Sequence, residues 1–239
     1  MKTIVFIPTY NERENIEKLI DEILNLNIDN LEVLIVDDNS PDGTWKIVED
    51  IERKKKSVHL LLRKEEKGRG NAGKSGFKFA VEHKADYIIE MDADFSHHPR
   101  EIPKLLNEIR DADLILGSRL ILGGKDVGRG IVRELITKLS NLYIRLLLGL
   151  KVKDCNSGFR CFRREVLEAI DIDKLESKGP TIVQEVLFKS YLKGFKIKEV
   201  PITFTERAVG KSKLFGIKHL WQGYYIVLRL KTLKMLRAI

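Results

Sequence analysis

Two carboxylates separated by one small residue, Asp92 and Asp94, are the strongest chemical signal in this sequence. They follow the apolar run Tyr87-Ile88-Ile89, which is typical of a buried strand. Open α/β sheets bind their ligands just past the carboxyl ends of the strands, so these side chains stand where a site is expected. Paired carboxylate oxygens suit Mg²⁺ or Mn²⁺, and such an ion usually also binds substrate phosphates. The alternative is a solvated acidic turn, because Asp-x-Asp is short and common.

Two other expected strand ends carry polar side chains as well. The first strand runs into Pro8-Thr9-Tyr10-Asn11-Glu12, which offers an aromatic face and a carboxylate, and the second ends at Asp37-Asp38. Parallel strands of one sheet present their carboxyl ends at one edge, so these groups should lie near Asp92 and Asp94. Each strand end alone could be an ordinary capped loop, but together they predict a nucleoside-diphosphate site.

A third motif matches a different nucleotide-binding pattern. Residues 68–75, GRGNAGKS, fit the P-loop consensus, in which Lys74 would contact phosphates. That motif requires an apolar strand running directly into its first glycine, whereas the charged residues 63–67 intervene here. We therefore expect the start of a helix that approaches the sheet closely, and keep a P-loop ATPase or GTPase as an alternative class.

Length and composition favour one large intracellular α/β domain. The chain has 239 residues, of which 43% are hydrophobic, enough for a sizeable core. Its cysteines, Cys155 and Cys161, form no disulfide framework or zinc-like spacing and point weakly to a reducing compartment. The apolar N-terminal run is too short for a signal peptide, and no apolar run reaches the 18 or more residues expected of a membrane span.

The net charge of +8 is concentrated near the C-terminus. Residues 207–239 hold eight of the 43 Lys and Arg residues and no acidic residue, leaving 35 to balance the 35 Asp and Glu residues of 1–206. Charge placed this way predicts an anionic partner for the tail: phosphate, a membrane surface or nucleic acid. The neutral body and three acidic strand ends argue against a nucleic-acid-binding module.

The elements that must position these groups alternate along the chain. The expected strands are short and apolar: residues 3–7, 32–36, 58–62, 87–91, 114–117 and 196–200. Helical segments lie between them: residues 15–26, 44–54, 71–83 and 99–109. This alternation predicts a mostly parallel sheet flanked by helices. Beyond residue 119, glycines mark a loop, residues 131–150 form an apolar helical stretch, and residues 214–239 form an amphipathic basic helix.

Six motifs, in order, resemble those of family 2 glycosyltransferases with the GT-A (Rossmann-like) nucleotide-diphospho-sugar transferase fold. The closest resemblance is to dolichol-phosphate (polyprenyl-phosphate) mannosyltransferases, and it covers nearly the whole chain. The motifs are IPTYNERENI (7–16), VDDNSPDGT (36–44), MDADFSHHP (91–99), GSR (117–119), NSGFRCF (156–162) and ERAVGKSK (206–213). The resemblance implies a catalytic domain over residues 1–213, followed by a helix (214–239) for membrane-surface or partner contact.

The resemblance also implies a role for each matching residue. Donor-nucleotide contacts would come from Pro8, Tyr10, Glu12, Val36 and Asp38. Metal and diphosphate would be held by Asp92 and Asp94, with Ala93 lining the site and Ser96 standing where close relatives have a metal-binding Gln. Arg119 would lie near the sugar or phosphates, and Arg207 and Lys213 would grip the diphosphate and the acceptor phosphate. Asp94, Arg119 and Arg207 would carry the chemistry, with Arg133 and Lys211 as further anion-binding candidates.

Three further positions have weaker expectations. Glu185 could serve as a general base or be a solvated helical residue, and residues 156–160 could be a turn or lie on the acceptor side of the cleft. His97 and His98 are expected at the surface or behind the site.

The implied activity is an inverting, Mg²⁺- or Mn²⁺-dependent transfer of mannose from GDP-mannose to dolichyl or polyprenyl phosphate. The product would be dolichyl β-D-mannosyl phosphate for protein glycosylation. A polyprenyl-phosphate glucosyltransferase, or another family 2 enzyme with a different donor or acceptor, is the enzymatic alternative. The basic tail predicts peripheral attachment to the cytoplasmic face of a membrane, through lipid or through a membrane-anchored partner subunit.

Overall fold

The computed structural model describes residues 1–206 and 217–235, with side chains from residue 223 onward in the second segment. Its strands are β1 (Thr3–Thr9), β2 (Leu31–Asp37), β3 (Val58–Leu62), β4 (Tyr87–Glu90), β5 (Leu114–Ser118), β6 (Lys125–Val127), β7 (Arg160–Arg163), β8 (Ile197–Pro201) and β9 (Thr203–Thr205). Its α-helices are α1 (Ile16–Leu24), α2 (Thr44–Lys54), α3 (Arg69–Glu82), α4 (Ile102–Glu108), α5 (Ile131–Leu148), α6 (Arg164–Ala169), α7 (Ile182–Leu192) and α8 (Ile217–Met235). Short 3-10 helices span η1 (Pro99–Glu101), η2 (Ile109–Asp111) and η3 (Ile172–Lys174).

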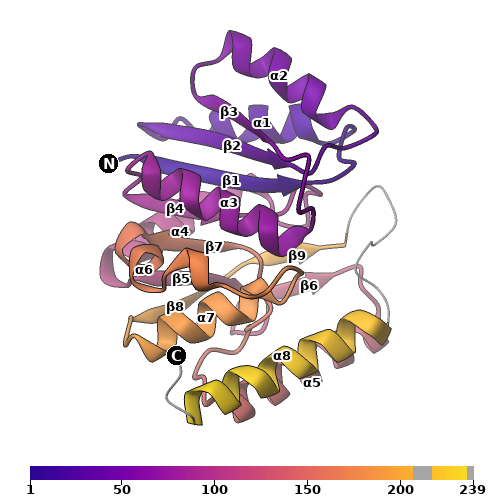
Figure 1. Ribbon diagram of the computed structural model, residues 1–239, viewed down its shortest axis with the longest axis vertical. Helices are drawn as coiled ribbons and strands as arrows, with labels where there is room; N and C mark the ends of the chain where they lie inside the picture. The colour runs from indigo at the N-terminus through magenta and orange to yellow at the C-terminus, as the bar shows by residue number, and fades with distance from the viewer. Residues whose placement is uncertain (207–216, 236–239) are drawn as a thin grey trace.

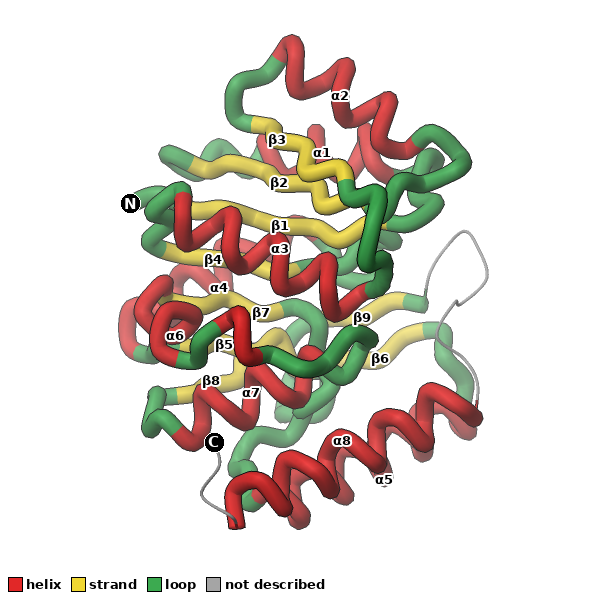
Figure 2. The backbone as a smooth tube through the Cα atoms, viewed as in Figure 1, coloured by secondary structure: helices red, strands yellow, loops and turns green. Residues whose placement is uncertain are grey.

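A seven-stranded sheet in the order β3-β2-β1-β4-β7-β5-β8 crosses the described part of the molecule (Figures 1 and 2). β1 lies between β2 and β4, and its Val5 is paired with Val33 of β2 and Ile89 of β4 in parallel register. All pairings in this sheet are parallel except those of β7, which is antiparallel to both β4 and β5. The predicted α/β class and each predicted strand and helix lying within the described residues are confirmed.

β7 is the strand of the main sheet that periodicity did not predict. Its sequence, Arg160-Cys161-Phe162-Arg163, has only two apolar residues, and an arginine stands at each end. Arg163 donates to the carbonyl oxygens of Ile109, Arg110 and Ala112, so its charge is well accommodated at the end of the strand. A strand that reads as polar thus occupies the middle of the sheet, because its arginines find partners there.

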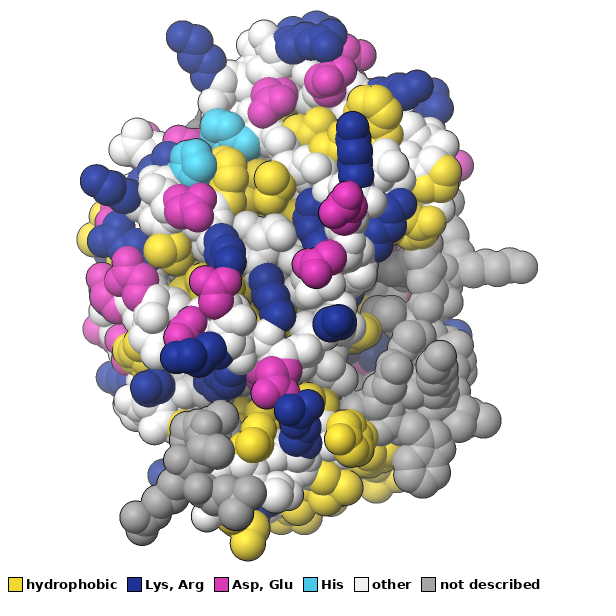
Figure 3. Space-filling view, viewed as in Figure 1, with side chains coloured by type: hydrophobic (Ala, Val, Ile, Leu, Met, Phe, Trp, Pro, Cys, Tyr) yellow, Lys and Arg dark blue, Asp and Glu magenta, His cyan; other side chains and the backbone are white. Residues whose placement is uncertain are grey.

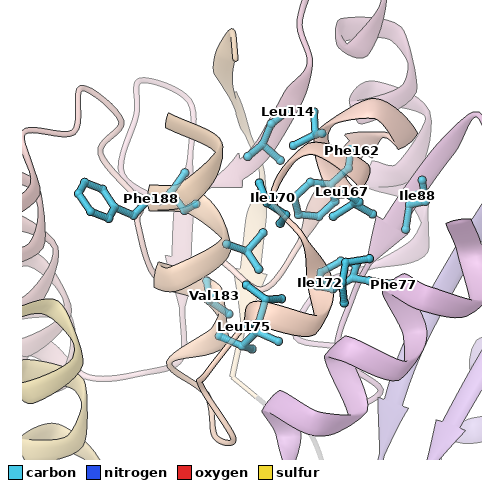
Figure 4. Packing of buried hydrophobic residues seen from close by; sticks show 14 of the residues in the cluster. Phe77, Ile88, Leu114, Phe162, Leu167, Ile170, Ile172, Leu175, Val183 and Phe188 are labelled. Atoms are coloured by element: carbon cyan, nitrogen blue, oxygen red, sulfur yellow. The ribbon is translucent and has the colours of Figure 1, made fainter. Parts of the chain in front are cut away.

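Helices cover both faces of the sheet with separate hydrophobic layers. α3, α6 and α7 lie over one face, and α1, α2 and α4 supply the other. In the first layer, Phe77 of α3 and Phe162 of β7 pack edge to face with ring centroids 5.4 Å apart (Figure 4). Phe77 also meets Phe6 of β1 at 4.9 Å, so this layer joins the two halves of the sheet.

A small second sheet lies past the carboxyl ends of the main strands (Figure 1). It consists of β6 and β9 in parallel pairing, and Phe204 of β9 forms an antiparallel bridge with His97 in the loop after β4. This arrangement brings residues 95–97 and residues 203–206 together at the same edge of the main sheet.

α5 and α8 form a helix pair at one end of the molecule (Figures 1 and 2). Ile226, Val227 and Leu230 of α8 are buried, and α8 contacts α5 and α7. Figure 3 shows hydrophobic side chains gathered over this end of the molecule. No helix among residues 1–206 and 217–235 combines the length and the apolar character that crossing a membrane requires. The predicted helix at 214–239 is thus present over 217–235, and its described part packs on the body.

Gly76 gives a test of how closely α3 packs on the sheet. A Cβ at this position would overlap the ring of the fully buried Phe6, whereas a Cβ on Gly223 of α8 would meet nothing within 4 Å. Gly76→Ala should therefore destabilise the protein by about 1–3 kcal/mol, the usual cost of overpacking. Gly223→Ala should stabilise it by about 0.5–1 kcal/mol because alanine favours helices. Urea unfolding of both variants checks this, and equal midpoints would contradict it.

Candidate functional site

Three acidic or polar strand ends meet at one edge of the sheet, as the sequence predicted. β2, β1 and β4 are neighbours and parallel, so the segments that follow Asp37, Thr9 and Glu90 emerge side by side (Figure 1). The acidic residues at this edge differ in what their carboxylates contact, and those contacts separate structural from functional candidates.

Asp37 is a structural residue of this edge. It is fully buried, and its Oδ2 accepts hydrogen bonds from the hydroxyls of Thr9 and Ser40, each at 2.7 Å. Its Oδ1 accepts from the Ser40 amide at 2.7 Å. Ser40 in turn accepts from the Asn11 amide at 2.9 Å, so Asp37 ties the loop after β1 to the loop after β2.

Asp38, predicted to contact base and ribose, has an ion-pair partner in Arg63. Its Oδ1 lies 2.6 Å from Arg63 Nη1, and its Oδ2 accepts from the Gly68 amide at 2.6 Å. Burial raises the pKa of Asp38, and the Gly68 N–H and Arg63 offset this only in part. The carboxylate therefore lies at the site edge but is already bound to the segment that leads into α3.

The other predicted nucleotide contacts are spread around this edge. Tyr10 is 43% exposed and presents its ring to solvent. The Glu12 amide donates to Thr44 Oγ1 at 3.0 Å, which holds the 10–13 loop against the start of α2. Pro8 is partly buried in β1, whereas the Val36 side chain is fully buried in the core. The side chain of Val36 is thus not available to a nucleotide.

The Asp-Ala-Asp segment forms a tight turn after β4. Asp92 keeps 38% of its side chain exposed, while Ala93, Asp94 and Ser96 are buried. The Ser96 amide donates to Asp94 Oδ1 at 3.0 Å. Phe95 between them has a φ of 59°, a left-handed conformation that is costly for a bulky residue and is concentrated at functional sites.

His97 is buried beside Asp92, so of the two expected locations the one behind the site is confirmed. Its ring stacks on Phe159 at 5.3 Å and meets Phe204 edge to face at 5.4 Å. Its Nδ1 lies 3.8 Å from Asp92 Oδ2. Burial lowers the pKa of His97 despite the nearby aspartates, which favours a neutral ring at pH 7.

The donor set of this turn fits a divalent ion that shares its ligands with a substrate. Within the described residues, no three His, Cys, Asp or Glu side chains come together in a way that could hold a metal ion. Mg²⁺ is commonly bound through one or two carboxylates plus substrate phosphates, and Asp92 and Asp94 supply that number. The assignment of both aspartates and Ser96 as metal ligands stays a prediction.

A buried charge network lies directly beneath Asp92. Glu90 and Arg160 are fully buried, and Arg160 donates to Glu90 Oε2 through both Nε and Nη2. Arg69, at the start of α3, lies 2.7 Å from Glu90 Oε1 and 3.5 Å from Asp92 Oδ1 through its Nη2. Burial disfavours the Glu90 charge, yet the two guanidinium groups hold the pKa of Glu90 below its usual range.

Arg119 approaches the site from β5 and is held by a carboxylate. Its Nε and Nη2 donate to the two oxygens of the fully buried Asp154 at 2.8 and 2.9 Å. The guanidinium carbon also lies 4.8 Å from the centre of the Phe204 ring, which Arg129 approaches at 5.4 Å. This bidentate pair orients Arg119 and leaves its other N–H groups uncommitted to Asp154.

A cavity of about 450 Å³ separates the loop after β5 from α5. It is lined by polar, basic and apolar side chains: Arg119, Leu120, Ile121, Gly124, Asp126, Glu134, Lys138, Asn141, Leu142, Arg145 and Lys153. Arg133, near the start of α5, pairs with Glu206 after β9. The cavity thus connects the Arg119 side of the site with the apolar helix α5.

Comparison with known proteins identifies the family. The model of the family described as "Glycosyl transferase family 2" matches residues 4–171, more than half of the chain. The chain belongs to glycosyl transferase family 2.

Two relatives of this glycosyltransferase are 41% identical to it. One is the undecaprenyl-phosphate mannosyltransferase of Micrococcus luteus, aligned over 216 residues that cover 90% of this chain and 88% of that protein. The other is the dolichol-phosphate mannosyltransferase of Pyrococcus furiosus, aligned over 220 residues that cover 90% of this chain and 60% of that longer protein.

Solved structures with the GT-A fold agree with the observed architecture. Glucosyl-3-phosphoglycerate synthase from Mycobacterium tuberculosis, in complex with Mn²⁺, UDP and glucosyl-3-phosphoglycerate, superposes with a TM-score of 0.68 at 21% identity, covering 98% of this chain and 79% of that one. A mannosyltransferase from Pyrobaculum calidifontis in complex with GDP-Man and Mn²⁺ gives a TM-score of 0.61 at 17% identity, covering 99% and 64%. These likenesses establish the fold of the glycosyltransferase.

The expected helix start after Gly68 is confirmed, because residues 69–75 are the first turns of α3. Lys74 donates to the carbonyl of Leu175, so the alternative of a P-loop is excluded. Glu185 is 1% exposed and accepts from the amides of Glu176 and Ser177, so it is neither a solvated residue nor an available base. Arg207, Lys211 and Lys213 lie outside the described residues, and their roles stay predictions.

Sequence reasoning missed several residues that support the site. Arg63, Arg69 and Asp154 each contact a predicted site residue, and Glu90 contacts Arg69. Gly158 lies against Asp92, where a Cβ would be 3.3 Å from Oδ2. The sequence did contain one indication of this network. Glu90 lies inside an apolar strand, and a buried carboxylate requires a cationic partner.

Replacing Glu185 tests its structural role in the glycosyltransferase. Burial raises its pKa, but the amides of Glu176 and Ser177 and nearby Lys189 hold the pKa below its usual range. Glu185→Gln should cost about 1.5–3 kcal/mol of stability at pH 7, the ordinary worth of hydrogen bonds to a charged group. The stabilisation is fully present above the unfolded pKa of about 4.3 and is lost as the pH falls through the folded pKa.

Unfolding free energies of wild type and Glu185→Gln between pH 7 and 3 check this prediction. Their difference should shrink below about pH 4, where the carboxylate becomes protonated. Exposed Glu82, changed to Gln, is the matched control and should show little difference throughout. A kcat loss far beyond the loss of folded protein would contradict the structural role and restore Glu185 as a base.

Proposed function

We propose that this chain is a polyprenyl-phosphate mannosyltransferase that transfers mannose from GDP-mannose to dolichyl or polyprenyl phosphate with the help of Mg²⁺ or Mn²⁺. The observation that supports this most is its 41% identity, across 90% of the chain, with a protein named as an undecaprenyl-phosphate mannosyltransferase. The acidic sheet edge supplies the groups that a nucleoside-diphosphate sugar requires.

The donor would lie across the ends of β2, β1 and β4. The exposed ring of Tyr10 offers a stacking surface for the base, and Asp38 offers a carboxylate near the ribose. The diphosphate would reach Asp92 and Asp94. An ion bound there would supply positive charge to the leaving diphosphate. Arg119, held in place by Asp154, is positioned to add a second positive charge without reorganising.

The acceptor needs little help from a protein base. A phosphate monoester has a second pKa near ~6, so an acceptor phosphate is largely dianionic at neutral pH. One of its oxygens forms a bond to the anomeric carbon while the bond from that carbon to the diphosphate breaks, which inverts the configuration and yields a β-linked product from an α-linked donor. The engagement of Glu185 by backbone amides agrees with a reaction in which positioning and charge dominate.

The surface of α5 suits a substrate that resides in a bilayer. A stripe of large apolar side chains on this helix is exposed: Ile131, Val132, Leu135, Ile136, Leu139, Leu142 and Leu146. Tyr225, Leu228 and Met235 extend exposed apolar surface onto α8. We propose that α5 and α8 lie on the membrane surface, with residues 1–213 as the catalytic domain and the basic segment 214–239 adding electrostatic attraction to anionic lipid.

Transfer of labelled sugar into an organic-extractable lipid tests the proposed reaction. With polyprenyl phosphate and Mn²⁺ or Mg²⁺, wild type should convert GDP-mannose to a mannolipid, and EDTA should stop it. Asp94→Asn removes a ligand charge and should lower kcat by at least ~100-fold, since even residues that only orient ligands are worth 10–100-fold.

Asp111→Asn, an acidic residue of η2 away from the sheet edge, is the control and should retain wild-type transfer. Transfer from UDP-glucose but not from GDP-mannose would overturn the donor. A folded enzyme that makes no lipid product from either donor would overturn the acceptor.

Vesicle flotation tests the membrane surface separately. Leu135→Asp with Leu139→Asp should weaken binding to anionic vesicles by more than ~10-fold, because each buried leucine contributes about 1.5–3 kcal/mol. Both side chains are more than half exposed, at 56% and 55%, so the variant should keep its melting temperature. Unchanged flotation of the variant would contradict membrane docking. So would light scattering that shows wild type to be a dimer formed through this face.

A further inference from the structure

Arg69 is a buried cation placed between two carboxylates of different purpose. Its side chain is 18% exposed, and its Nη2 lies 2.7 Å from Glu90 Oε1 and 3.5 Å from Asp92 Oδ1. Glu90 belongs to the interior of the sheet, whereas Asp92 is half of the predicted metal-binding pair. The proposed transfer reaction assigns no step to Arg69, so its place beside Asp92 needs its own explanation.

Glu90 does not need the whole charge of Arg69. Arg160, also fully buried, already donates to Glu90 Oε2 through Nε at 3.0 Å and through Nη2, and its Nη1 donates to the Val183 carbonyl at 3.0 Å. Glu90 and Arg160 therefore balance each other in charge, while Arg69 contacts the other Glu90 oxygen, Oε1, at 2.7 Å. The charge of Arg69 also acts on Asp92, whose Oδ1 lies 3.5 Å away.

Arg69 weakens the attraction of the turn for a free divalent ion. Arg69 and Arg160 carry two positive charges against the three negative charges of Glu90, Asp92 and Asp94, so the five groups together hold one net negative charge. A guanidinium 3.5 Å from a ligating carboxylate repels an incoming cation and competes for the same oxygen. A nucleoside diphosphate adds several negative charges and so strengthens the attraction of the site for the ion.

Arg69 also has bonding capacity left for an anion. Within the described residues, its Nη1 is buried and makes no hydrogen bond. A guanidinium can bind two groups at once through its fork of donors, so Arg69 can keep Glu90 while it releases Asp92.

We propose that Arg69 is a positioning residue that occupies Asp92 while the site is empty and so makes the divalent ion bind together with the nucleoside diphosphate. This inference rests on the proposed function, because it requires the ion at Asp92 and Asp94. It differs from a purely structural role, in which Arg69 would only balance Glu90 and its removal would leave ion binding unchanged.

Mn²⁺ binding to the purified full-length chain tests the proposal without reference to activity. The concentration of free Mn²⁺ is measured by electron paramagnetic resonance as the protein concentration is increased, with and without GDP. The proteins compared are wild type, Arg69→Met and Arg69→Lys. Arg69→Met should bind Mn²⁺ alone about tenfold more tightly, a modest value for coupling between ligands. The enhancement of Mn²⁺ binding by GDP should shrink by a similar factor, and Arg69→Lys, which keeps the charge, should resemble wild type.

Arg163→Met is the matched control, because it also removes a partly buried arginine next to β4. Arg163 donates to carbonyls at the amino end of the sheet, far along β4 from Asp92, so this variant should lose stability and keep wild-type Mn²⁺ binding. Arg69→Gln replaces Arg69→Met if the latter does not fold by circular dichroism, and the same tightening is expected.

The outcomes separate this inference from the proposed function. Mn²⁺ binding that is unchanged or weaker in the folded neutral variants, while wild type binds Mn²⁺ with GDP, would overturn the role of Arg69 alone. Wild type that binds no Mn²⁺ with either GDP or GDP-mannose would overturn the proposed metal site itself, and the inference with it.

Discussion

The ion pair between Glu90 and Arg160 is the constraint on which the architecture of the site depends. Both side chains are fully buried, and they stand directly opposite each other in the β4–β7 ladder. Removing one partner of such a pair costs about 3–5 kcal/mol, because the other charge stays buried alone. A slip of one residue would also turn Arg160 to the other face of the sheet. The pair therefore selects one register for β7, and through β7 it places β5, β8 and Arg119 relative to Asp92.

Carboxylates of this glycosyltransferase perform distinct tasks that composition cannot separate. Asp37, Asp154 and Glu185 are fully or almost fully buried, and each is bonded to hydroxyls, amides or a guanidinium that it holds in place. Asp92 keeps a large exposed fraction and lies 3.5 Å from Arg69 and 3.8 Å from His97. A buried carboxylate with several close hydrogen bonds helps to hold the structure together. A partly exposed carboxylate with more distant neighbours can still bind a ligand.

The sequence predicted what depends on local pattern and missed what depends on distant partners. Apolar runs gave the outer and central parallel strands, and the order of acidic strand ends gave the location of the site. β7 could not be predicted, since Arg160 reads as a surface residue until its partner, 70 residues earlier, is known. Arg69 was read within a P-loop-like motif for the same reason, and Glu185 as a base because its amide donors arise from a loop without periodic pattern.

The location of α5 shows how a polar site and an apolar acceptor can be reconciled in the proposed reaction. Three residues separate this helix from β6, whose partner β9 is bridged to His97 behind Asp92. Arg133 in its first turn pairs with Glu206, while the exposed apolar stripe runs along the helix from Ile131 to Leu146. A lipid phosphate is an anion joined to a long hydrocarbon, so it needs cationic side chains at one end of an apolar surface. α5 provides both within a single rigid element, which in the proposed arrangement would set the height of the sheet edge above the membrane surface.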